Sequence, residues 1–169
     1  MDVTLEKWTM GFSEDIVSAF VSKKLIDKLP ESVPYPFEKK HARYYIEQRM
    51  FNNEEQQYCR AIIADGKAVG GIDVFLGRGQ YSKSAELTFW LSEPYQDTDI
   101  GKSAIKKACA DIFELYSVVR IFARPYADDD VSSRLLEAAD FCFEGHLRKS
   151  IRRDMKLYDQ NIYSILRDE

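Results

Sequence analysis

The spacing of apolar side chains predicts a strand and then a helix at the start of the chain. Residues 3–10 have the pattern of a first strand. A helix is expected from Ser13, a favourable N-cap residue, because apolar residues then recur at helical spacing: Ile16, Val17, Phe20 and Leu25. Three prolines, Pro30, Pro34 and Pro36, forbid a continuing helix. We interpret this proline-rich bend as the lip of a binding site, followed by a second helix over residues 37–51.

Residues 58–77 change to the pattern of paired strands. Ile62 and Ile63 precede Asp65-Gly66, and the apolar residues that follow are Val69, Ile72, Val74 and Phe75. An Asp-Gly pair between two apolar runs is typical of a two-residue hairpin turn. Residues 85–91 then alternate between apolar and polar side chains, as in a strand whose two faces differ, and Pro94 ends that strand.

The clearest helix is predicted over residues 100–116. Its apolar side chains form one stripe, made of Ile100, Ala104, Ile105, Ala108, Ile112 and Leu115. A short apolar strand follows at residues 118–123, so residues 85–123 have the order and length of a right-handed crossover between two parallel strands. Backbone N–H groups and the positive end of the helix dipole converge where such a helix begins, which favours the binding of a pyrophosphate.

The last part of the chain predicts a short helix over residues 131–139 and two closing strands over residues 141–150 and 155–166. No repeat or long linker interrupts this series. We therefore expect residues 1–169 to form a single mixed α/β (α+β) domain. Its central sheet is expected to be largely antiparallel, to be split at one parallel strand pair, and to be flanked by about four helices.

Composition and charge narrow the function. Apolar residues make up 45% and charged residues 31%, which is a globular composition. The formal charge of −4 argues against a nucleic-acid partner and mildly favours cationic ligands such as amines. The longest apolar stretches are far too short to cross a membrane, and residues 1–20 lack a hydrophobic signal core, so a cytoplasmic protein without a membrane partner is expected.

The three cysteines, Cys59, Cys109 and Cys142, form no close pair. Neither a disulfide framework nor a zinc site is therefore predicted, and we expect each cysteine to be buried and no metal to be bound. Five basic residues cluster at positions 148–156: Arg148, Lys149, Arg152, Arg153 and Lys156. The solvated rim of a hairpin is the simplest interpretation of this cluster, and a docking patch for an acidic partner is the alternative.

The segment Gln96-Asp97-Thr98-Asp99-Ile100-Gly101 resembles the acetyl-CoA loop of the GNAT superfamily of N-acetyltransferases. That loop has Arg or Gln, two residues of any type, Gly, any residue, and then Gly or Ala, and five of the six positions comply here. Residues 85–91 resemble the family's fourth strand, and residues 132–137 with Phe141 resemble its last helix and the strand beyond. Residues 144–149 and 159–166 are similar to the C-terminus of the RimJ and RimL type of ribosomal-protein acetyltransferase.

This resemblance implies a GNAT fold that transfers acetyl from acetyl-CoA to a primary amine, on a protein N-terminus or a small molecule. Glu86 would be the general base, directly or through water, and Ser132 would act near the thioester. The amides from Gln96 to Gly101 would hold the pyrophosphate, and the backbone of residues 89–91 would pair with the pantetheine arm. The implied cofactor-binding set is Phe89, Trp90, Leu91, Gln96, Asp97, Thr98, Asp99, Ile100, Gly101, Lys102, Asp129 and Ser132.

The acceptor amine must be neutral when it attacks the thioester, so its own pKa sets the demand on the base. An α-amine with a pKa near 8 is about a tenth neutral at pH 7, whereas a lysine near 10.4 is neutral about four times in ten thousand. A weak or water-linked base therefore suits an α-amine better. The expected acceptor is a small-molecule amine or a protein N-terminus, and the expected oligomeric state is a monomer or a homodimer.

The chain departs from the family at four positions. Asp99 stands where the loop's first glycine is expected, Asp129 where this branch has asparagine, and Asp140 where it has glycine. Leu136 occupies the position of a tyrosine acid in many other members, so Ser132 or water would have to protonate the departing thiolate. These departures keep open a second function, a non-catalytic CoA-binding or partner-binding domain on the same fold.

Several of the selected residues have a structural alternative. Glu86 could pair with a lysine or arginine on its strand face, and Asp99 could be the N-cap of its helix. Ser132 could cap or solvate its short helix. Trp90 is interpreted as a core residue first and as a wall of the acceptor pocket second. His41 and His146 are interpreted as structural.

Overall fold

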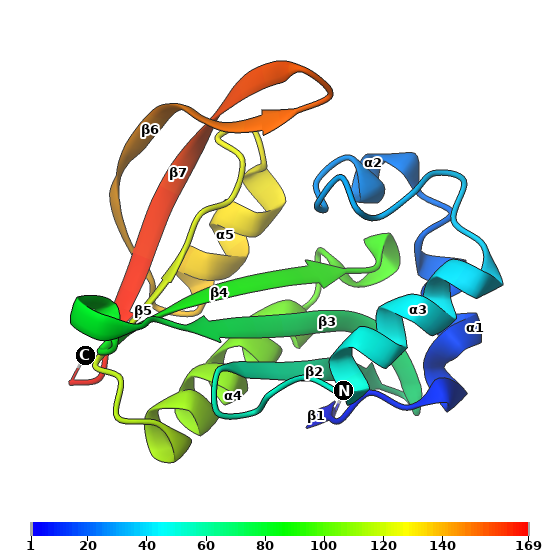
Figure 1. The fold of residues 1–169 in the computed structure, drawn as a ribbon, viewed down its shortest axis with the longest axis horizontal. Coiled ribbons are helices and arrows are strands. Elements are labelled where there is room, and N and C mark those ends of the chain that lie inside the picture. The colour runs from blue at the N-terminus through cyan, green and yellow to red at the C-terminus, as the bar shows by residue number, and fades with distance from the viewer. Residues whose placement is uncertain (1, 169) are drawn as a thin grey trace.

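A seven-stranded sheet organises residues 2–168, the part of the chain that the computed structural model describes (Figure 1). The strand order is β1-β2-β3-β4-β5-β7-β6. Only β4 and β5 pair in parallel, and the other neighbours are antiparallel, which confirms the predicted sheet. The strands are β1 (Val3–Glu6), β2 (Gln57–Ala64), β3 (Lys67–Leu76), β4 (Ser84–Leu91), β5 (Arg120–Ala123), β6 (Cys142–Arg153) and β7 (Lys156–Leu166).

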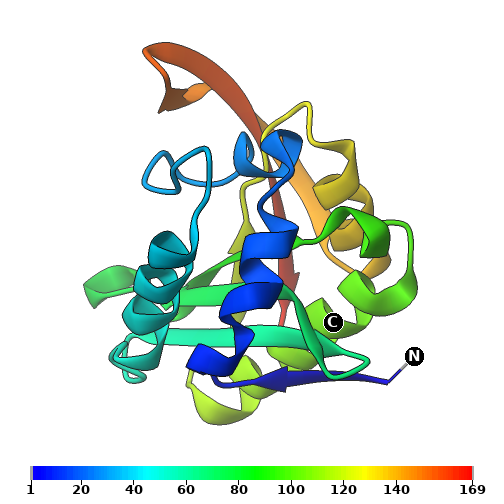
Figure 2. The ribbon, with the colours of Figure 1, turned by 90° about the vertical axis from the view of Figure 1, so that its right-hand side faces the viewer.

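Helices cover both faces of the sheet. In Figure 1, α3 crosses in front of the strands and α4 passes behind them, and Figure 2 shows the same two helices on opposite sides. The described residues contain five α-helices, one more than predicted, because the first predicted helix is divided: α1 (Ser13–Ala19), α2 (Lys23–Ile26), α3 (Lys39–Met50), α4 (Asp99–Leu115) and α5 (Asp130–Ala138). None of them combines the length and the apolar character needed to cross a membrane.

Each face of the sheet has its own buried core. Behind the sheet, Ile105 of α4 and Leu136 of α5 are buried in one core with Leu87 of β4. In front, Trp8 and Trp90 pack with side chains of α1 and α3. The predicted apolar stripe of α4 is buried as far as Ile112, but Leu115, the last residue of the helix, is 62% exposed.

The crossover from β4 through α4 to β5 produces the feature that defines the site. The parallel ladder joins three residue pairs and ends at Glu86 opposite Phe122. Strand β4 continues to Leu91, which still pairs with Gly70 of β3. The two parallel strands therefore diverge after Glu86 and leave a V-shaped gap in the middle of the sheet.

The N-terminal region differs from the prediction in three respects. The first strand ends at Glu6 instead of residue 10, and a 3-10 turn (Met10–Phe12) follows. Ser13 is the first residue of α1 and not its N-cap, which is Phe12 and makes no side-chain hydrogen bond. The helix also stops at Ala19, and the chain restarts at α2, where the Ser22 hydroxyl accepts a hydrogen bond from the Leu25 N–H at 3.1 Å.

Two tight turns close the hairpins of the sheet. Asp65 and Gly66 join β2 to β3 with φ of 50° and 74°, which confirms the predicted two-residue turn. Asp154 and Met155 join β6 to β7 in the same way, so β6 is longer than predicted and reaches Arg153. Cys59 and Cys109 are buried as predicted, but the prediction for Cys142 is wrong: it is exposed, because it begins the edge strand β6.

Candidate active site

A cleft of about 850 Å³ passes through the gap between β4 and β5, and we call it the central cleft. Side chains from both faces of the sheet line it, among them Thr88 and Trp90 in front and Leu135 behind. The proline-rich bend forms one wall, as its interpretation as a lip predicted, through Leu29, Pro30, Ser32, Val33, Pro34 and Phe37. Ser150 and Ile151 of the β6–β7 hairpin form part of the opposite wall.

Strand β4 presents one backbone edge to this gap. The Ser92 N–H donates to the Val69 carbonyl at 2.8 Å, which points that residue towards β3. Because backbone groups alternate along a strand, those of Phe89 and Leu91 point the other way, into the gap. The Gln96 side chain reaches back and donates to the Leu91 carbonyl at 2.9 Å. An extended ligand that contains amides can therefore add to β4 as a strand would.

The N-terminus of α4 lies beside this edge. Thr98 is its N-cap, and its hydroxyl accepts a hydrogen bond from the Ile100 N–H at 3.3 Å, so the alternative in which Asp99 caps the helix is wrong. Within residues 2–168, the Asp99 side chain makes no hydrogen bond or ion pair. A Cβ on Gly101 would lie 2.9 Å from Leu135 and 3.2 Å from Leu91, so glycine allows the first turn of α4 to pack this closely.

The structure brings about half of the predicted site residues to the wall of the central cleft. Those that line it are Glu86, Phe89, Trp90, Leu91, Gln96, Asp129 and Ser132. The side chains of the other six do not: Asp97, Thr98, Asp99, Ile100, Gly101 and Lys102. Ile100 and Gly101 are buried in the packing of α4, and Asp97 forms an exposed ion pair with Arg134 at 3.2 Å. These six could contribute to the site through the backbone at the start of the helix.

Glu86 is held by Arg124, which follows β5. The arginine donates through Nε and Nη2 to the two carboxylate oxygens, each at 2.9 Å. This bidentate contact matches the structural alternative for Glu86, a strand-face carboxylate paired with a cation. Both side chains nevertheless line the central cleft, and the Glu86 side chain is only 27% exposed. A carboxylate at the end of the β4–β5 ladder therefore faces any ligand that occupies the gap.

Asp129 and Ser132 form one unit at the start of α5. Asp129 is the N-cap, accepting from the Ser132 N–H at 3.2 Å and from the Ser132 hydroxyl at 2.8 Å. Ser132 is therefore held by the capping residue Asp129 and does not itself cap the helix. Its hydroxyl hydrogen points to Asp129, so it would have to turn before it could protonate a leaving group in the cleft. Leu136 is completely buried and does not line the cleft.

The floor of the central cleft contains a buried polar chain that the sequence did not predict. Arg49 donates through Nε to Asp73 at 3.2 Å and stacks on the Tyr45 ring at 3.4 Å. The Tyr45 hydroxyl accepts a hydrogen bond from Trp90 at 2.8 Å. Burial raises the pKa of Tyr45, so the phenol stays neutral. Trp90 is 5% exposed and serves as both core and cleft wall.

One signal in the sequence could have identified these buried polar contacts. Asp73 interrupts the apolar run from Val69 to Phe75, and a carboxylate inside a buried strand needs a partner. Arg49, Tyr45 and Arg124 carried no such signal, since they reach the site only through the packing of α3 and the divergence of β5. These four residues line the cleft together with the predicted ones.

The two histidines have different surroundings. His41 lines the central cleft, and its Nδ1 accepts from the Glu38 N–H at 3.0 Å as part of the cap of α3. His146 lies between Asn161 and Asp159 on the hairpin, and these two hydrogen bonds raise its pKa. Across residues 2–168 no group of three or more His, Cys, Asp or Glu side chains is placed to hold a metal ion.

Comparisons with known proteins agree with this geometry. The family described as acetyltransferase (GNAT) domain matches residues 2–142. A protein of Bacillus subtilis strain 168 called uncharacterized N-acetyltransferase YoaA is 28% identical over 103 residues. The match covers 61% of this chain and 58% of that protein, so the chain spans less than two thirds of this relative's length.

Several solved structures share the fold. The microcin self-immunity acetyltransferase MccE, in complex with acetyl-CoA and AMP, has a TM-score of 0.85 at 22% identity over 98% of this chain and 92% of its own. A GNAT-family acetyltransferase from Bacillus anthracis has a TM-score of 0.84 at 18% identity over 100% and 97% of the two chains. RimL, a ribosomal-protein α-N-acetyltransferase in complex with coenzyme A, has a TM-score of 0.83 at 13% identity over 97% and 93%. Because the family model matches residues 2–142, the chain belongs to the GNAT acetyltransferase family.

Proposed function

We propose that the protein transfers an acetyl group from acetyl-CoA to a primary amine. The observation that carries this proposal is the gap between β4 and β5, which offers a strand edge at Phe89 and Leu91 and a carboxylate at Glu86 in one continuous cleft. The structures of MccE with acetyl-CoA and of RimL with coenzyme A, which have the same fold, support the choice of cofactor.

The cofactor would extend from the helix N-terminus into the gap. The pantetheine arm contains amides and can pair with the free edge of β4. Its pyrophosphate would accept hydrogen bonds from backbone N–H groups in the first turn of α4, which Gly101 allows to lie close to Leu91. The thioester would then lie between β4 and Ser132 of α5.

The acetyl transfer needs one proton acceptor and one proton donor. The neutral amine nitrogen attacks the thioester carbonyl, a C–N bond forms, the C–S bond breaks, and the amine proton passes to Glu86 directly or through water. The departing thiolate takes a proton from the Ser132 hydroxyl after it turns from Asp129, or from water. Ser132 then regains a proton from water, and Glu86 releases its proton to solvent. Glu86 acts as the base only when its carboxylate exchanges part of its contact with Arg124 for the amine.

The acceptor is proposed to be a protein N-terminal α-amine, as in the RimJ and RimL branch, or a small-molecule amine. An α-amine is the more easily neutralised of the common protein amines, which suits a base that is shared with an arginine. The fold similarity to RimL and the resemblance of residues 144–149 and 159–166 support this branch.

The direct test is the release of free thiol from acetyl-CoA in the presence of a panel of peptide α-amines, lysine analogues and small amines. Turnover with an amine supports acetyl transfer. A non-catalytic CoA-binding domain is the second candidate, and Asp99 favours it, because a carboxylate at the first residue of α4 opposes the phosphates. Binding of CoA by calorimetry without turnover on any amine would establish that candidate.

A further inference from the structure

The β6–β7 hairpin concentrates positive charge that the proposed reaction does not use. Residues 148–157 hold five basic side chains and one acidic one, whereas the whole chain has a formal charge of −4. Within residues 2–168, four of these cations are exposed, and their side chains make no hydrogen bond or ion pair. We call these four the basic hairpin surface: Arg148, Lys149, Arg152 and Lys156.

The fifth cation fixes the hairpin to the rest of the molecule. Arg153 is buried and donates to the carbonyl of Leu29 in the proline-rich bend, and its guanidinium lies 3.9 Å from Asp27. The N–H of Asp154 donates to Glu31 of the same bend. The end of the hairpin is therefore anchored across the central cleft, and its position does not depend on the four free cations.

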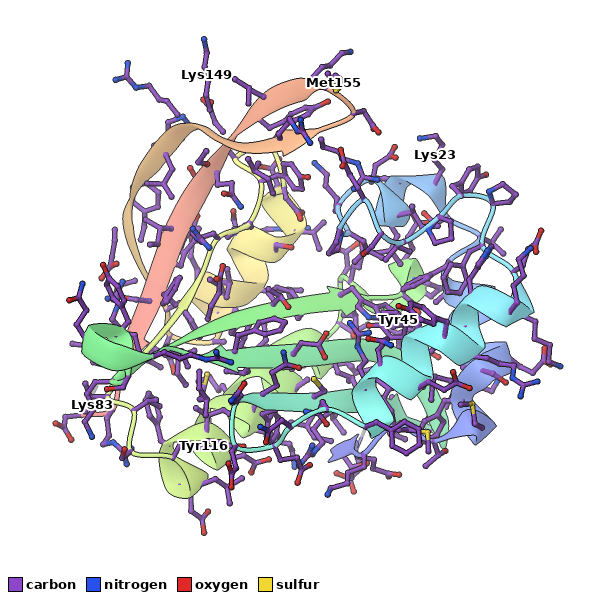
Figure 3. All side chains as sticks on the ribbon, in the orientation of Figure 1. Lys23, Tyr45, Lys83, Tyr116, Lys149 and Met155 are labelled. Carbon is purple, nitrogen blue, oxygen red and sulfur yellow. The ribbon has the colours of Figure 1, made fainter. Side chains whose placement is uncertain are left out.

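The free side chains lie on both faces at the end of the hairpin. Arg152 pairs with Leu157, one residue away from the buried Arg153, so these two point to the opposite face of the hairpin, whereas Lys156 pairs with Arg153 and is exposed on the face that Arg153 shares. The register of β6 shifts between Leu147 and Ile151, and in this bulge Lys149 has a φ of 51°. Figure 3 shows Lys149 extending away from the sheet and Met155 at the end of the hairpin.

Apolar side chains are interleaved with these charges. Met155 is 85% and Leu157 is 58% exposed. The basic hairpin surface thus combines unpaired cations with apolar contact area, which fits an acidic segment that also carries apolar residues. A nucleic acid or an anionic membrane fits less well, because the rest of the molecule is more acidic than the chain as a whole and repels an extended polyanion.

The place of the hairpin links this surface to the proposed reaction. Ser150 and Ile151 line the central cleft, and Arg152 follows them directly. A polypeptide whose N-terminal amine enters the cleft would emerge beside the hairpin. We propose that the basic hairpin surface docks an acidic, partly apolar segment of a protein acceptor, downstream of the acetylated amine. This inference rests on the proposed transfer to a protein N-terminus.

The test compares two peptides of equal length that share their first residues and a free α-amine. One continues with alternating Asp or Glu and Leu, and the other with Asn or Gln in place of the acids. We expect kcat/KM to be about tenfold higher for the acidic peptide, since several exposed ion pairs each contribute modestly. The variant R152E/K156E should lose this preference, whereas the matched variant K67E/K107E, with the same change in net charge at distant exposed sites, should keep it.

Turnover of a small amine should be unchanged in both variants, and about 0.5 M salt should remove the preference of the wild-type protein. Fluorescence anisotropy of labelled acidic peptide measures docking without turnover, so absence of turnover with intact peptide binding refutes the proposed function and leaves the docking surface. Equal kcat/KM for the two peptides would overturn the inference, as would an equal loss in both variants. Tighter binding of a single-stranded oligonucleotide or an anionic vesicle through the same residues would also overturn it.

Discussion

At the scale of single residues, the ion pair between Glu86 and Arg124 lets a proton-accepting role be separated from a structural one. The two side chains share two hydrogen bonds of 2.9 Å at the end of the parallel ladder. If the pair serves only to hold the strands, substitution of either partner should change kcat to a similar extent. If Glu86 accepts the amine proton, substitution of Glu86 should lower kcat more than substitution of Arg124.

We expect Glu86→Gln to lower kcat about a hundredfold or more at pH 7 and to leave the affinity for acetyl-CoA unchanged, because the amide keeps the shape and cannot take a proton. Arg124→Gln is the matched change on the other side of the pair, and it should keep most of the turnover, since it frees the carboxylate. Steady-state kinetics and calorimetry measure both. Equal losses of kcat in the two variants would show that Glu86 has a structural role and is not the base.

Asp99 is the other residue whose side chain can be tested alone, because Thr98 and not Asp99 caps α4. A carboxylate about 5 Å from a phosphate is repelled by roughly 3 kcal/mol at an effective dielectric near 20, of which screening leaves about a third. Glycine would also relax the backbone for a close approach to the ligand. We therefore expect Asp99→Gly to bind CoA about tenfold more tightly.

The same substitution should slightly lower the melting temperature, because an acidic residue in the first turn of a helix stabilises it by about 0.3–1 kcal/mol. Calorimetric titration at low and high salt separates charge from geometry, since a gain from charge shrinks as salt rises. Equal affinities of Asp99→Gly and wild type at both salts would show that the carboxylate points away from the phosphates.

At the scale of elements, the contact of α4 with α5 and β4 depends on the small volume of Gly101. A side chain there would meet Leu135 within 3.0 Å. We expect Gly101→Val to lower the free energy of unfolding by about 2 kcal/mol and the melting temperature by about 6 °C. Ala110→Val, at an exposed position of the same helix, is the control for the β-branched side chain. Chemical denaturation of both variants checks the difference, and similar losses would disprove the packing argument.

Periodicity predicted the elements whose apolar spacing is regular. The crossover from β4 through α4 to β5 and the hairpin turn at Asp65-Gly66 follow from local pattern and turn chemistry, and the structure contains both. The break between α1 and α2 was not predicted, because Val17, Phe20 and Leu25 continue a helical spacing across it. The residue preferences for the N-cap position also gave wrong predictions at Ser13 and Asp99, because the preceding residue is the N-cap in each case.

Residues of the candidate site were predicted on β4 and near the starts of α4 and α5, and they were missed where only the packing of α3 or the order of the strands brings them to the cleft. Glu86, Phe89 and Leu91 lie on β4, and their strand could be recognised from the chain. Arg49 and Asp73, which form a hydrogen bond, are 24 positions apart in the sequence, and Arg124 and Glu86 are 38 positions apart. Such contacts depend on the order of strands in the sheet, which apolar spacing does not specify.

At the scale of the whole molecule, the cofactor should act as a stabilising element, because the central cleft passes between the two cores. A ligand that binds only the folded state stabilises it by about 2.7 kcal/mol at a hundred times its Kd, which corresponds to a rise of about 5–10 °C in melting temperature. We expect this rise with CoA in differential scanning fluorimetry. NAD has a pyrophosphate but no pantetheine arm and should raise it far less, and equal shifts would exclude pairing with β4.

The early end of the β4–β5 ladder gives an interior strand the properties of a sheet edge. Unpaired strand edges recruit stray extended segments, and proteins usually protect them with charge or cover. In this fold the walls of the cleft shelter the edge at Phe89 and Leu91, and the Gln96 side chain caps the Leu91 carbonyl. The amides of these two residues should therefore exchange with solvent faster than those of Thr88 and Trp90, which face β3, and slow down once an arm of matching amides lies beside them. In the proposed complex, the cofactor arm would act as an eighth strand in this seven-stranded sheet.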